Sequence, residues 1–403
     1  MSSSDELLVS RLRAAGSVFA EDEAQVLRES AGSADDLEAM TVRRLAGEPL
    51  EQVVGWAEFG GLRIRVVPGV FVPRRRTELL ARSTIDAAPR DGVVLDLCCG
   101  TAAVGALVEH ERPDVDVVAT DVDPVAVGCA RLNLTRGTAY AGDLFAAVPE
   151  RLRGAIDVVA VNAPYVPTAG IALMPPEARD HEPHVALDGG ADGVDVHRRV
   201  AAQVTPWLAP GGRVLVETSD AQVPWTALAL AEHGLRARVV RRDPEIGTAV
   251  VAGTPVRPGL PVAELPPLEF AFAGPLRDRL VGLVLDGSKT TTTSLVAELF
   301  VGGEDSEGMP AVGERWRVVD SAGDTACVVE TVGLRVARLA DVDLQHAVDE
   351  GEGDETVAQW RVSHAGFWEG AEMRAFLGDP SFRVDDETLV VLERLRLVEG
   401  YFS

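Results

Sequence analysis

The sequence predicts an α/β protein in which a parallel α/β sheet is followed by a second, α+β unit. Residues 50–253 alternate β-rich runs with helical stretches, a pattern typical of a parallel sheet covered by helices. Five closely spaced prolines then interrupt this pattern. The chain of 403 residues accommodates two or three domains at about 100–200 residues each.

The N-terminal residues 1–48 are expected to form a short helical segment. They are polar overall, and apolar side chains recur at helical spacing, as in Leu7, Leu8 and Leu12 and then Val26 and Leu27. The sheet domain is expected over residues 49–253. Its predicted strands are Val93–Leu97, Val115–Thr120, Ala155–Val161, Arg213–Glu217, Ala237–Arg241 and Thr248–Ala252.

Residues 254–266 are rich in proline and predict a linker. The second globular unit is expected over residues 267–403, where short strands alternate with helices rich in Trp and His. Its predicted strands are Arg315–Val319, Ala326–Thr331 and Thr388–Leu395.

Composition limits the cellular context. The formal net charge of −25 disfavours nonspecific binding to nucleic acid, which requires clustered cations. The run from Arg74 to Arg76 is a local exception that either binds an anion or is a solvated patch. We find no signal peptide, no membrane span and no metal-ligand or disulfide spacing among the four cysteines, so we expect a cytoplasmic protein without a metal or a membrane partner.

Lysine and asparagine are unusually scarce. Of 38 Lys and Arg residues only Lys289 is a lysine, and the only asparagines are Asn133 and Asn162. Arginine cannot lose its proton near neutral pH and aspartate cannot both donate and accept as an amide does. The surviving residues are therefore candidates for positions at which such a replacement fails.

Polar residues follow three predicted strands of the sheet domain. The segment CCGTAAVGALV after Val93–Leu97 predicts a tight turn that opens a helix, which brings backbone N–H groups beside a ligand. Asp121 ends the next strand, where an acid suits a ribose diol, and Asn162 ends a later one. These strand ends are expected to line one crevice at the carboxyl edge of the sheet.

The segments DLCCGTAAVG, ATDVDPVAV, GDLF and VNAPYVP resemble Rossmann-like class I S-adenosylmethionine-dependent methyltransferases of the amino-methylating type. FGGLRIRVVPGVFVPRRRTELL and HEPHVALDGGADGVDVHRRV narrow the resemblance to the HemK/PrmC glutamine methyltransferases. That family methylates the side-chain amide of a glutamine in peptide-chain release factors. The resemblance covers about residues 48–253 and implies S-adenosylmethionine as the cofactor.

The resemblance also implies roles for individual residues. The residues implied to bind the cofactor are Asp96, Cys98, Gly100 and Thr101 at the methionine part, Asp121 and Val122 at the ribose, Asp143 and Leu144 at the adenine, and Asn162. The residues implied to act on the acceptor amide are Asn162, the carbonyl of Ala163, Pro164 and Tyr165. Because an amide nitrogen is a poor nucleophile, such a site works by orienting the nitrogen toward the methyl group.

Several positions depart from the family pattern. Asn162-Ala163-Pro164-Tyr165 stands where the family has Asn-Pro-Pro-Tyr, and Cys98 and Ala102 replace glycines. Arg75 and Arg76 likewise replace a proline and an acid. The departures leave cofactor use intact and bear mainly on the identity of the substrate.

The last third of the chain resembles the ASCH domain, a small β-barrel related to RNA-binding PUA domains. The matching segments, within residues 267–397, are GSKTTTT, PAVGERW, VVETVGLRV and EGEGD. Some small members hydrolyse N4-acetylcytidine, and the resemblance implies Lys289, Thr292 and Glu350 as their working residues here. In that chemistry the lysine activates the threonine hydroxyl and the glutamate moves protons. Alternatively the domain only binds RNA or a nucleotide.

We therefore expect an N-methyltransferase that modifies a glutamine side chain of a release factor or a related translation protein, joined to an ASCH domain. Two alternatives stay open from the sequence. In the first, the methyl acceptor is an exocyclic amine of a nucleic-acid base. In the second, the chain is a catalytically weak, RNA-associated binding module.

Overall fold

A computed structural model of the chain describes residues 3–257 and 259–398. The chain divides into two compact units, residues 1–217 and 218–403. This division falls within a strand of the large sheet. The sequence instead predicts that the sheet domain ends at residue 253 and that a linker, residues 254–266, precedes the second domain, and these boundaries stay a prediction. Among the described helices, none combines the length and the apolar character needed to cross a bilayer.

Unit 1 begins with helices. The segment predicted to be helical, residues 1–48, contains α1 (Ser3–Ala14), α2 (Ala20–Ser30) and α3 (Ala34–Leu45), and α4 (Leu50–Val54) follows within the residues predicted for the sheet domain. Their apolar stripes meet in a small core that includes Leu8, Leu12 and Leu27. The antiparallel hairpin of β1 (Trp56–Phe59) and β2 (Leu62–Arg65) follows.

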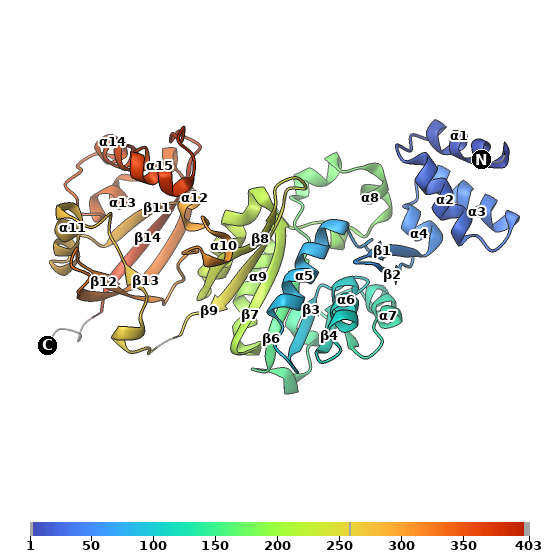
Figure 1. The fold of residues 1–403 in the computed structure, drawn as a ribbon, viewed down its shortest axis with the longest axis horizontal. Coiled ribbons are helices and arrows are strands. Elements are labelled where there is room, and N and C mark those ends of the chain that lie inside the picture. Colours follow the sequence, from blue (N-terminus) through green and yellow to red (C-terminus); the bar gives the residue numbers. More distant parts are fainter. Residues whose placement is uncertain (1–2, 258, 399–403) are drawn as a thin grey trace. The chain divides into compact units, whose positions relative to one another are not determined.

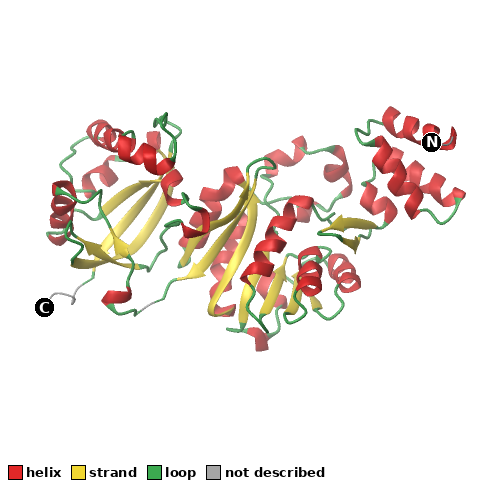
Figure 2. Ribbon diagram, in the orientation of Figure 1, coloured by secondary structure: helices red, strands yellow, loops and turns green. Residues whose placement is uncertain are grey.

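A seven-stranded sheet with the strand order β5-β4-β3-β6-β7-β9-β8 confirms the predicted α/β sheet. The strands are β3 (Val93–Leu97), β4 (Asp116–Asp121), β5 (Thr138–Ala141), β6 (Ile156–Val161), β7 (Leu208–Ser219), β8 (Leu235–Asp243) and β9 (Thr248–Pro255). Strands β5, β4, β3, β6 and β7 pair in parallel, and β8 pairs antiparallel to β9. Figure 2 shows the helices that lie against the sheet.

The helices of the sheet domain are α5 (Glu78–Ala87), α6 (Ala103–Glu111), α7 (Pro124–Asn133), α8 (Pro176–His181), α9 (Asp195–Val204) and α10 (Val223–Ala231). Because helices cover it, the sheet is apolar within, and Val94, Leu95 and Val159 are fully buried. The chain moves from β3 outward through β4 to β5 and then returns to β6 on the other side of β3. A crevice opens at such a reversal, at the carboxyl ends of the strands.

The observed strands differ from the predicted ones mainly at their ends. β4 begins and ends one residue later than predicted, and β7 extends well beyond Arg213–Glu217. No strand was predicted at β1, β2 or β5, nor at β10 (Pro267–Leu268) or β11 (Thr291–Leu295). These strands have between two and five residues, which is too short for an alternating pattern to stand out.

Residues beyond the proline-rich segment contain a five-stranded sheet with the order β10-β12-β13-β14-β11. Besides β11, its strands are β10 (Pro267–Leu268), β12 (Arg315–Val319), β13 (Thr325–Arg338) and β14 (Leu389–Leu397). The helices are α11 (Pro275–Leu285), α12 (Val296–Leu299), α13 (Leu344–Asp349), α14 (Val357–Trp368) and α15 (Ala371–Leu377). Two apolar clusters pack on this sheet, one around Trp360 and Trp368 and the other around Trp316.

Candidate active site

The residues predicted in the sheet domain come together. Every one of the predicted cofactor and acceptor residues from Asp96 to Tyr165 lines a single cavity within unit 1. The cavity lies at the carboxyl ends of β3, β4 and β6, where the strand order reverses. The crevice expected from the sequence is therefore present.

The loop after β3 has an unusual backbone. Cys98, Gly100 and Ala102 all have positive φ angles, of 59°, 54° and 56°. A residue with a Cβ pays about 1–2 kcal/mol for this left-handed conformation. This cost explains why glycine is the family's residue at the positions of Cys98 and Ala102. A Cβ built on Gly100 meets nothing within 4 Å, so open space lies beside this residue of the cavity wall.

Asp96 lies at the floor of the cavity near the end of β3. Its carboxylate accepts a hydrogen bond from the backbone N–H of Gly105, at 2.9 Å, in the first turn of α6. Burial raises the pKa of Asp96 to about 7, an effect that the Gly105 bond opposes and the nearby Asp121 carboxylate increases. A cation bound at this point would favour the ionised form of Asp96.

Asp121 ends β4 with its carboxylate held in place. One oxygen accepts from the N–H of Gly100 at 2.8 Å and the other accepts from the N–H of Asp123 at 2.9 Å. Burial raises the pKa of this carboxyl, and the two backbone bonds oppose the rise. A carboxylate fixed in this way at the edge of the sheet can accept hydrogen bonds from a ribose diol.

Asp143 and Leu144 form the third part of the cavity wall. Asp143 is exposed and pairs at 2.5 Å with Arg199 of α9, which also lines the cavity. Leu144 is buried, and its φ of 48° turns the chain sharply after Asp143.

The loop after β6 carries the predicted acceptor residues. Asn162 donates from Nδ2 to the hydroxyl of Thr77 at 3.1 Å, and the Tyr165 hydroxyl donates to Oε1 of Glu217 at 3.2 Å. The replacement residue Ala163 is buried. Burial raises the pKa of Tyr165, and the Glu217 carboxylate increases the effect.

No role was predicted for Thr77 or Glu217, and Arg76 was considered only as part of the run Arg74–Arg76. All three residues line the cavity. Glu217 lies near the end of β7, next to the acceptor loop because Val216 pairs with Val161 of β6. An acid at the carboxyl end of a predicted strand was a usable signal, because strand ends of a parallel sheet meet at one edge.

The charge of the cavity wall suits the cofactor that the sequence resemblance implies. Besides Glu217 at the acceptor loop, four carboxyl groups line the wall, those of Asp96, Asp121, Asp123 and Asp143, together with the guanidinium groups of Arg74, Arg76 and Arg199. S-adenosylmethionine carries a sulfonium and an ammonium group. No three His, Cys, Asp or Glu side chains are arranged to hold a metal ion in the part of the chain that the structure describes. The acidic side chains of the wall outnumber its arginines, which suits the cationic groups of that cofactor.

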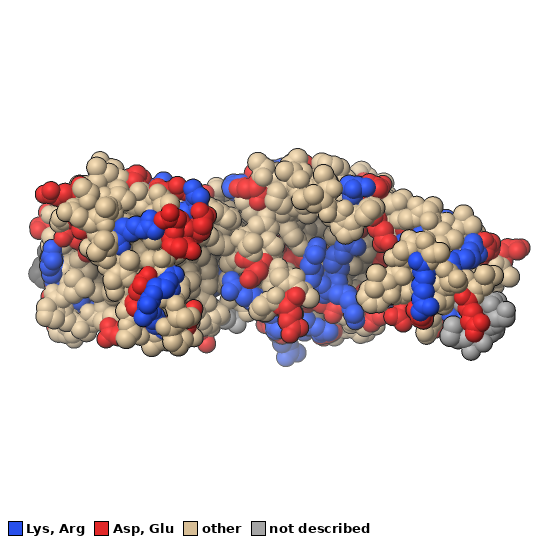
Figure 3. Space-filling model, turned by 90° about the horizontal axis from the view of Figure 1, so that it is seen from above, with Lys and Arg blue, Asp and Glu red and all other residues tan. Residues whose placement is uncertain are grey.

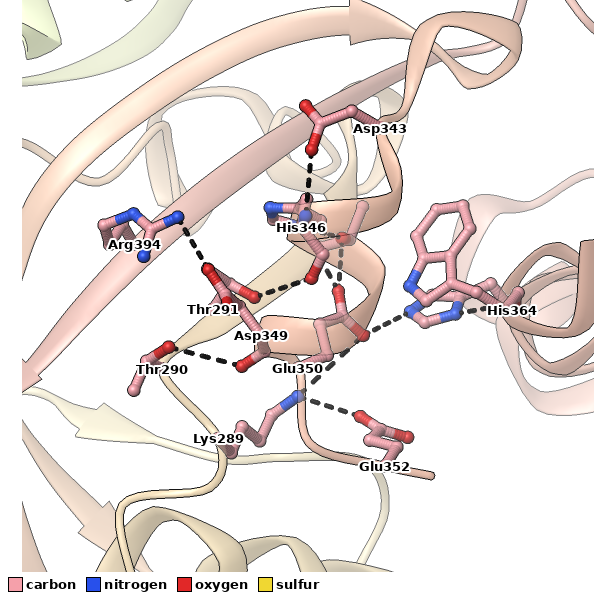
Figure 4. Close-up of polar contacts among 12 residues, drawn as sticks. Lys289, Thr290, Thr291, Asp343, His346, Asp349, Glu350, Glu352, His364 and Arg394 are labelled. Atoms are coloured by element: carbon pink, nitrogen blue, oxygen red, sulfur yellow. Dashed lines mark hydrogen bonds and ion pairs between the residues drawn. The ribbon is translucent and has the colours of Figure 1, made fainter. Parts of the chain in front are cut away.

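The second group of predicted residues lies in unit 2, around Lys289 (Figure 4). The Lys289 side chain is only 1% exposed, and its Nζ lies 2.8 Å from Oε1 of Glu352 and 4.0 Å from Oε2 of Glu350. Glu350 caps the C-terminus of α13 and its side chain is fully buried. The structure thus brings two of the three predicted residues together.

Two histidines and a threonine complete the surroundings of Glu350. His364 of α14 lies 3.1 Å from Oε2, and His346 lies 3.3 Å from Oε1. Thr293 donates to Oε1 at 2.5 Å, and its hydroxyl also lies 2.8 Å from Nε2 of His346. Burial acts to raise the pKa of Glu350, but the histidines and Lys289 outweigh it and hold this pKa well below its usual range.

Thr292 lies elsewhere. Side chains alternate along β11, so Thr291 and Thr293 share the face toward α13, where Thr291 also bonds to a carbonyl of that helix. Thr292 is paired across the sheet with Glu393 of β14. Thr293 rather than Thr292 therefore stands beside Glu350.

Five of the six arginines on the described strands of the five-stranded sheet are paired with acids. Arg396 and Arg315 contact Glu330, Arg335 contacts Asp343, Arg338 contacts Asp341 and Arg394 contacts Asp349, whereas Arg317 donates to the carbonyl of Leu265. Figure 3 shows the same mixing of acidic and basic side chains on the face in view. A nucleic-acid phosphate at these arginines competes with a carboxylate, which disfavours sequence-independent binding there.

Comparisons with known proteins match two parts of the chain to two different family models. Residues 61–173 match the family model described as methyltransferase small domain, and residues 269–399 match the ASCH domain. The chain is 40% identical over 202 residues to the release factor glutamine methyltransferase of Mycolicibacterium smegmatis, covering 49% of this chain and 71% of that protein.

Two further matches each cover part of the chain. A Streptomyces pristinaespiralis enzyme named 4-amino-L-phenylalanine/4-methylamino-L-phenylalanine methyltransferase is 37% identical over 191 residues, covering 45% of this chain and 64% of that protein. A crystal structure of an ASCH domain from Lactobacillus crispatus is 26% identical, with a TM-score of 0.29, and covers 33% of this chain and 79% of that one.

Proposed function

Because the chain belongs to the release factor glutamine methyltransferase family, we propose that it methylates the side-chain amide nitrogen of a glutamine in a peptide-chain release factor. S-adenosylmethionine supplies the methyl group, on a sulfonium that makes the methyl carbon electrophilic. Such a substrate implies that the enzyme acts in the cytoplasm.

The observation that carries this proposal is the acceptor loop at the cavity wall. Asn162, the Ala163 carbonyl and Tyr165 stand at the end of β6, beside the carboxylates suited to the cofactor. An acceptor amide here needs orientation more than a strong base, because its nitrogen forms the N–C bond while the methyl–sulfur bond breaks. The nitrogen then loses one proton, which passes to solvent.

The direct test is methyl transfer from labelled S-adenosylmethionine to a purified release factor. We expect a gain in mass of one CH₂ on the peptide that contains the glutamine, located by fragmentation. Label on RNA or DNA alone would instead favour the base amine as acceptor. Cofactor binding without turnover on any of these substrates would favour the RNA-associated binding module.

Cofactor affinity is expected to depend on pH through Asp96. Its pKa of about 7 in the ligand-free protein leaves the carboxyl neutral at lower pH, so a cationic ligand must first displace a proton. Affinity therefore rises with pH until about 7, by at most about tenfold per pH unit. Titration calorimetry on the wild type and on Asp96→Asn checks this. A steep dependence that persists in Asp96→Asn would assign the titration to another group, of which Asp121 is the nearest candidate.

For the ASCH domain we propose hydrolysis of an N-acylated cytidine. The proposal is supported by the contact between the Thr293 hydroxyl and Nε2 of His346, beside the buried Glu350. The hydroxyl attacks the acyl carbon as its proton passes to Glu350, to which it already donates. The C–N bond breaks as the released amine takes up that proton, and water then releases the acyl group as a carboxylic acid.

Adjacent threonines provide a matched test of this second activity. With N4-acetylcytidine, Thr293→Ala is expected to lower hydrolysis about 100-fold, whereas Thr292→Ala retains it within a few-fold. The opposite ranking would restore Thr292 as the working hydroxyl. Binding of the nucleoside or of RNA without hydrolysis by the wild type would identify a binding domain.

A further inference from the structure

Glu217 is a buried carboxyl that the proposed function does not use. Its side chain is 1% exposed, although it lines the cavity beside the acceptor loop. Oε1 receives the Tyr165 hydroxyl at 3.2 Å and lies 3.7 Å from Nε of Arg76. Oε2 has no partner at normal hydrogen-bond geometry among the described residues. A buried carboxylate oxygen in this position needs a donor.

Thr77 is the neighbour that can supply the proton. It is 3% exposed, lines the same cavity, and lies beside Asn162. The Thr77 oxygen accepts from Asn162, so its proton needs another acceptor, and Oε2 of Glu217 on the same cavity wall offers one. Burial raises the pKa of Glu217, and the Thr77 hydroxyl is among the neighbours that oppose this rise.

The direction of this bond determines the orientation of Asn162. A hydroxyl has one proton, and an ionised carboxylate only accepts. If Thr77 donates to Glu217, its oxygen can only accept from Asn162, which requires Nδ2 to face Thr77, as observed at 3.1 Å. The carbonyl oxygen Oδ1 of Asn162 is then the end left for a ligand.

We infer that Glu217 is a positioning residue, which acts through Thr77 to keep the carbonyl oxygen of Asn162 turned toward the methyl acceptor. This inference rests on the proposed amide acceptor. With this orientation Oδ1 accepts an N–H of the acceptor amide and helps to aim its nitrogen. With the opposite orientation the NH₂ groups of Asn162 and of the acceptor would face each other, two donors without an acceptor.

The composition of the chain offers a direct readout, since Asn133 and Asn162 are the only asparagines. Asparagine labelled with ¹⁵N in the side chain gives two NH₂ signals in the full-length protein, which Asn162→Ala assigns. We expect Thr77→Val and Glu217→Gln to shift the Asn162 signal and speed its hydrogen exchange. Thr77→Ser retains the hydroxyl and should preserve it. Asn133, bonded to backbone carbonyls of Arg65 and Thr101, is the internal control.

Kinetics provide the second readout. Thr77→Val and Glu217→Gln are expected to lower kcat for the release factor about 10- to 100-fold, with the Kd of S-adenosylmethionine changed by less than about twofold. Thr77→Ser should restore most of the activity, because only the hydroxyl matters. A loss of cofactor affinity in proportion to the loss of kcat would indicate a merely structural role and overturn the inference.

The two readouts separate this inference from the proposed function. If the wild type methylates the release factor but the variants keep both their kcat and the Asn162 signal, the inference is wrong and the function stands. If the wild type does not methylate the release factor, the proposed function fails. The Asn162 signal in Glu217→Gln then decides the inference alone, since an unchanged signal refutes the role of Glu217 and an altered one supports it.

Discussion

Replacing Asn162 by alanine is expected to lower kcat for release factor methylation by about 10²–10³-fold, the usual cost of removing one oriented polar group that acts on the transition state. Asn162 lines the cavity, is held by a hydrogen bond to Thr77, and is the side chain best able to orient an acceptor amide. The measurement is single-turnover methyl transfer at saturating S-adenosylmethionine, which isolates the chemical step.

Cofactor affinity is the control for this variant. The groups suited to the cofactor, Asp96 and Asp121, are held by backbone N–H groups and not by Asn162. We therefore expect the Kd of S-adenosylmethionine to change by only a few-fold. Retention of wild-type kcat in Asn162→Ala would remove the residue from the reaction and with it the main support for an amide acceptor.

The second large effect is expected from Lys289→Met in the ASCH domain. The replacement removes the buried cation that lies 2.8 Å from Glu352 and 4.0 Å from the fully buried Glu350. Breaking a buried pair leaves an uncompensated charge and costs about 3–5 kcal/mol. Hydrogen exchange at the amides of β11 and α13 measures this locally in the full chain, and we expect it to accelerate about 10²–10³-fold.

A matched control is Arg335→Met in the same sheet. Arg335 pairs with Asp343 at 2.6 Å, but the two side chains are 49% and 54% exposed. Exposed pairs of this kind contribute less than about 1 kcal/mol, so the same substitution should barely change the exchange rates. Equal changes in exchange rate in the two variants would show that the buried Lys289 pair stabilises the domain no more than an exposed pair does.

Much of the cofactor half of the site was predictable from the sequence because its residues follow strands. Local sequence patterns mark the carboxyl ends of β3, β4 and β6 and the turn after β3. Asp96, Asp121 and Asn162 lie within these strand ends or directly after them. Parallel strands bring their carboxyl ends to one edge, so spacing along the chain was enough to predict one shared cavity.

The choice between Thr292 and Thr293 was not predictable in this way. Four consecutive threonines, Thr290–Thr293, have the same chemistry, and only the phase of β11 decides which hydroxyl meets Glu350. A shift by one residue in a strand turns each side chain to the other face. The pairing of β11 with β14, almost a hundred positions later in the chain, fixes that phase.

The sequence by itself determined the fold class, the order of the two parts of the chain and most of the cavity-lining residues, because these depend on local periodicity and on strand ends. It also singled out Lys289 and Asn162 by their rarity. Only the tertiary structure decided that Thr77 bonds to Asn162, that Glu217 bonds to Tyr165, and that two histidines lie beside Glu350. The physical reason is that a hydrogen-bond network among buried side chains depends on distances between segments remote in sequence, which no local pattern encodes.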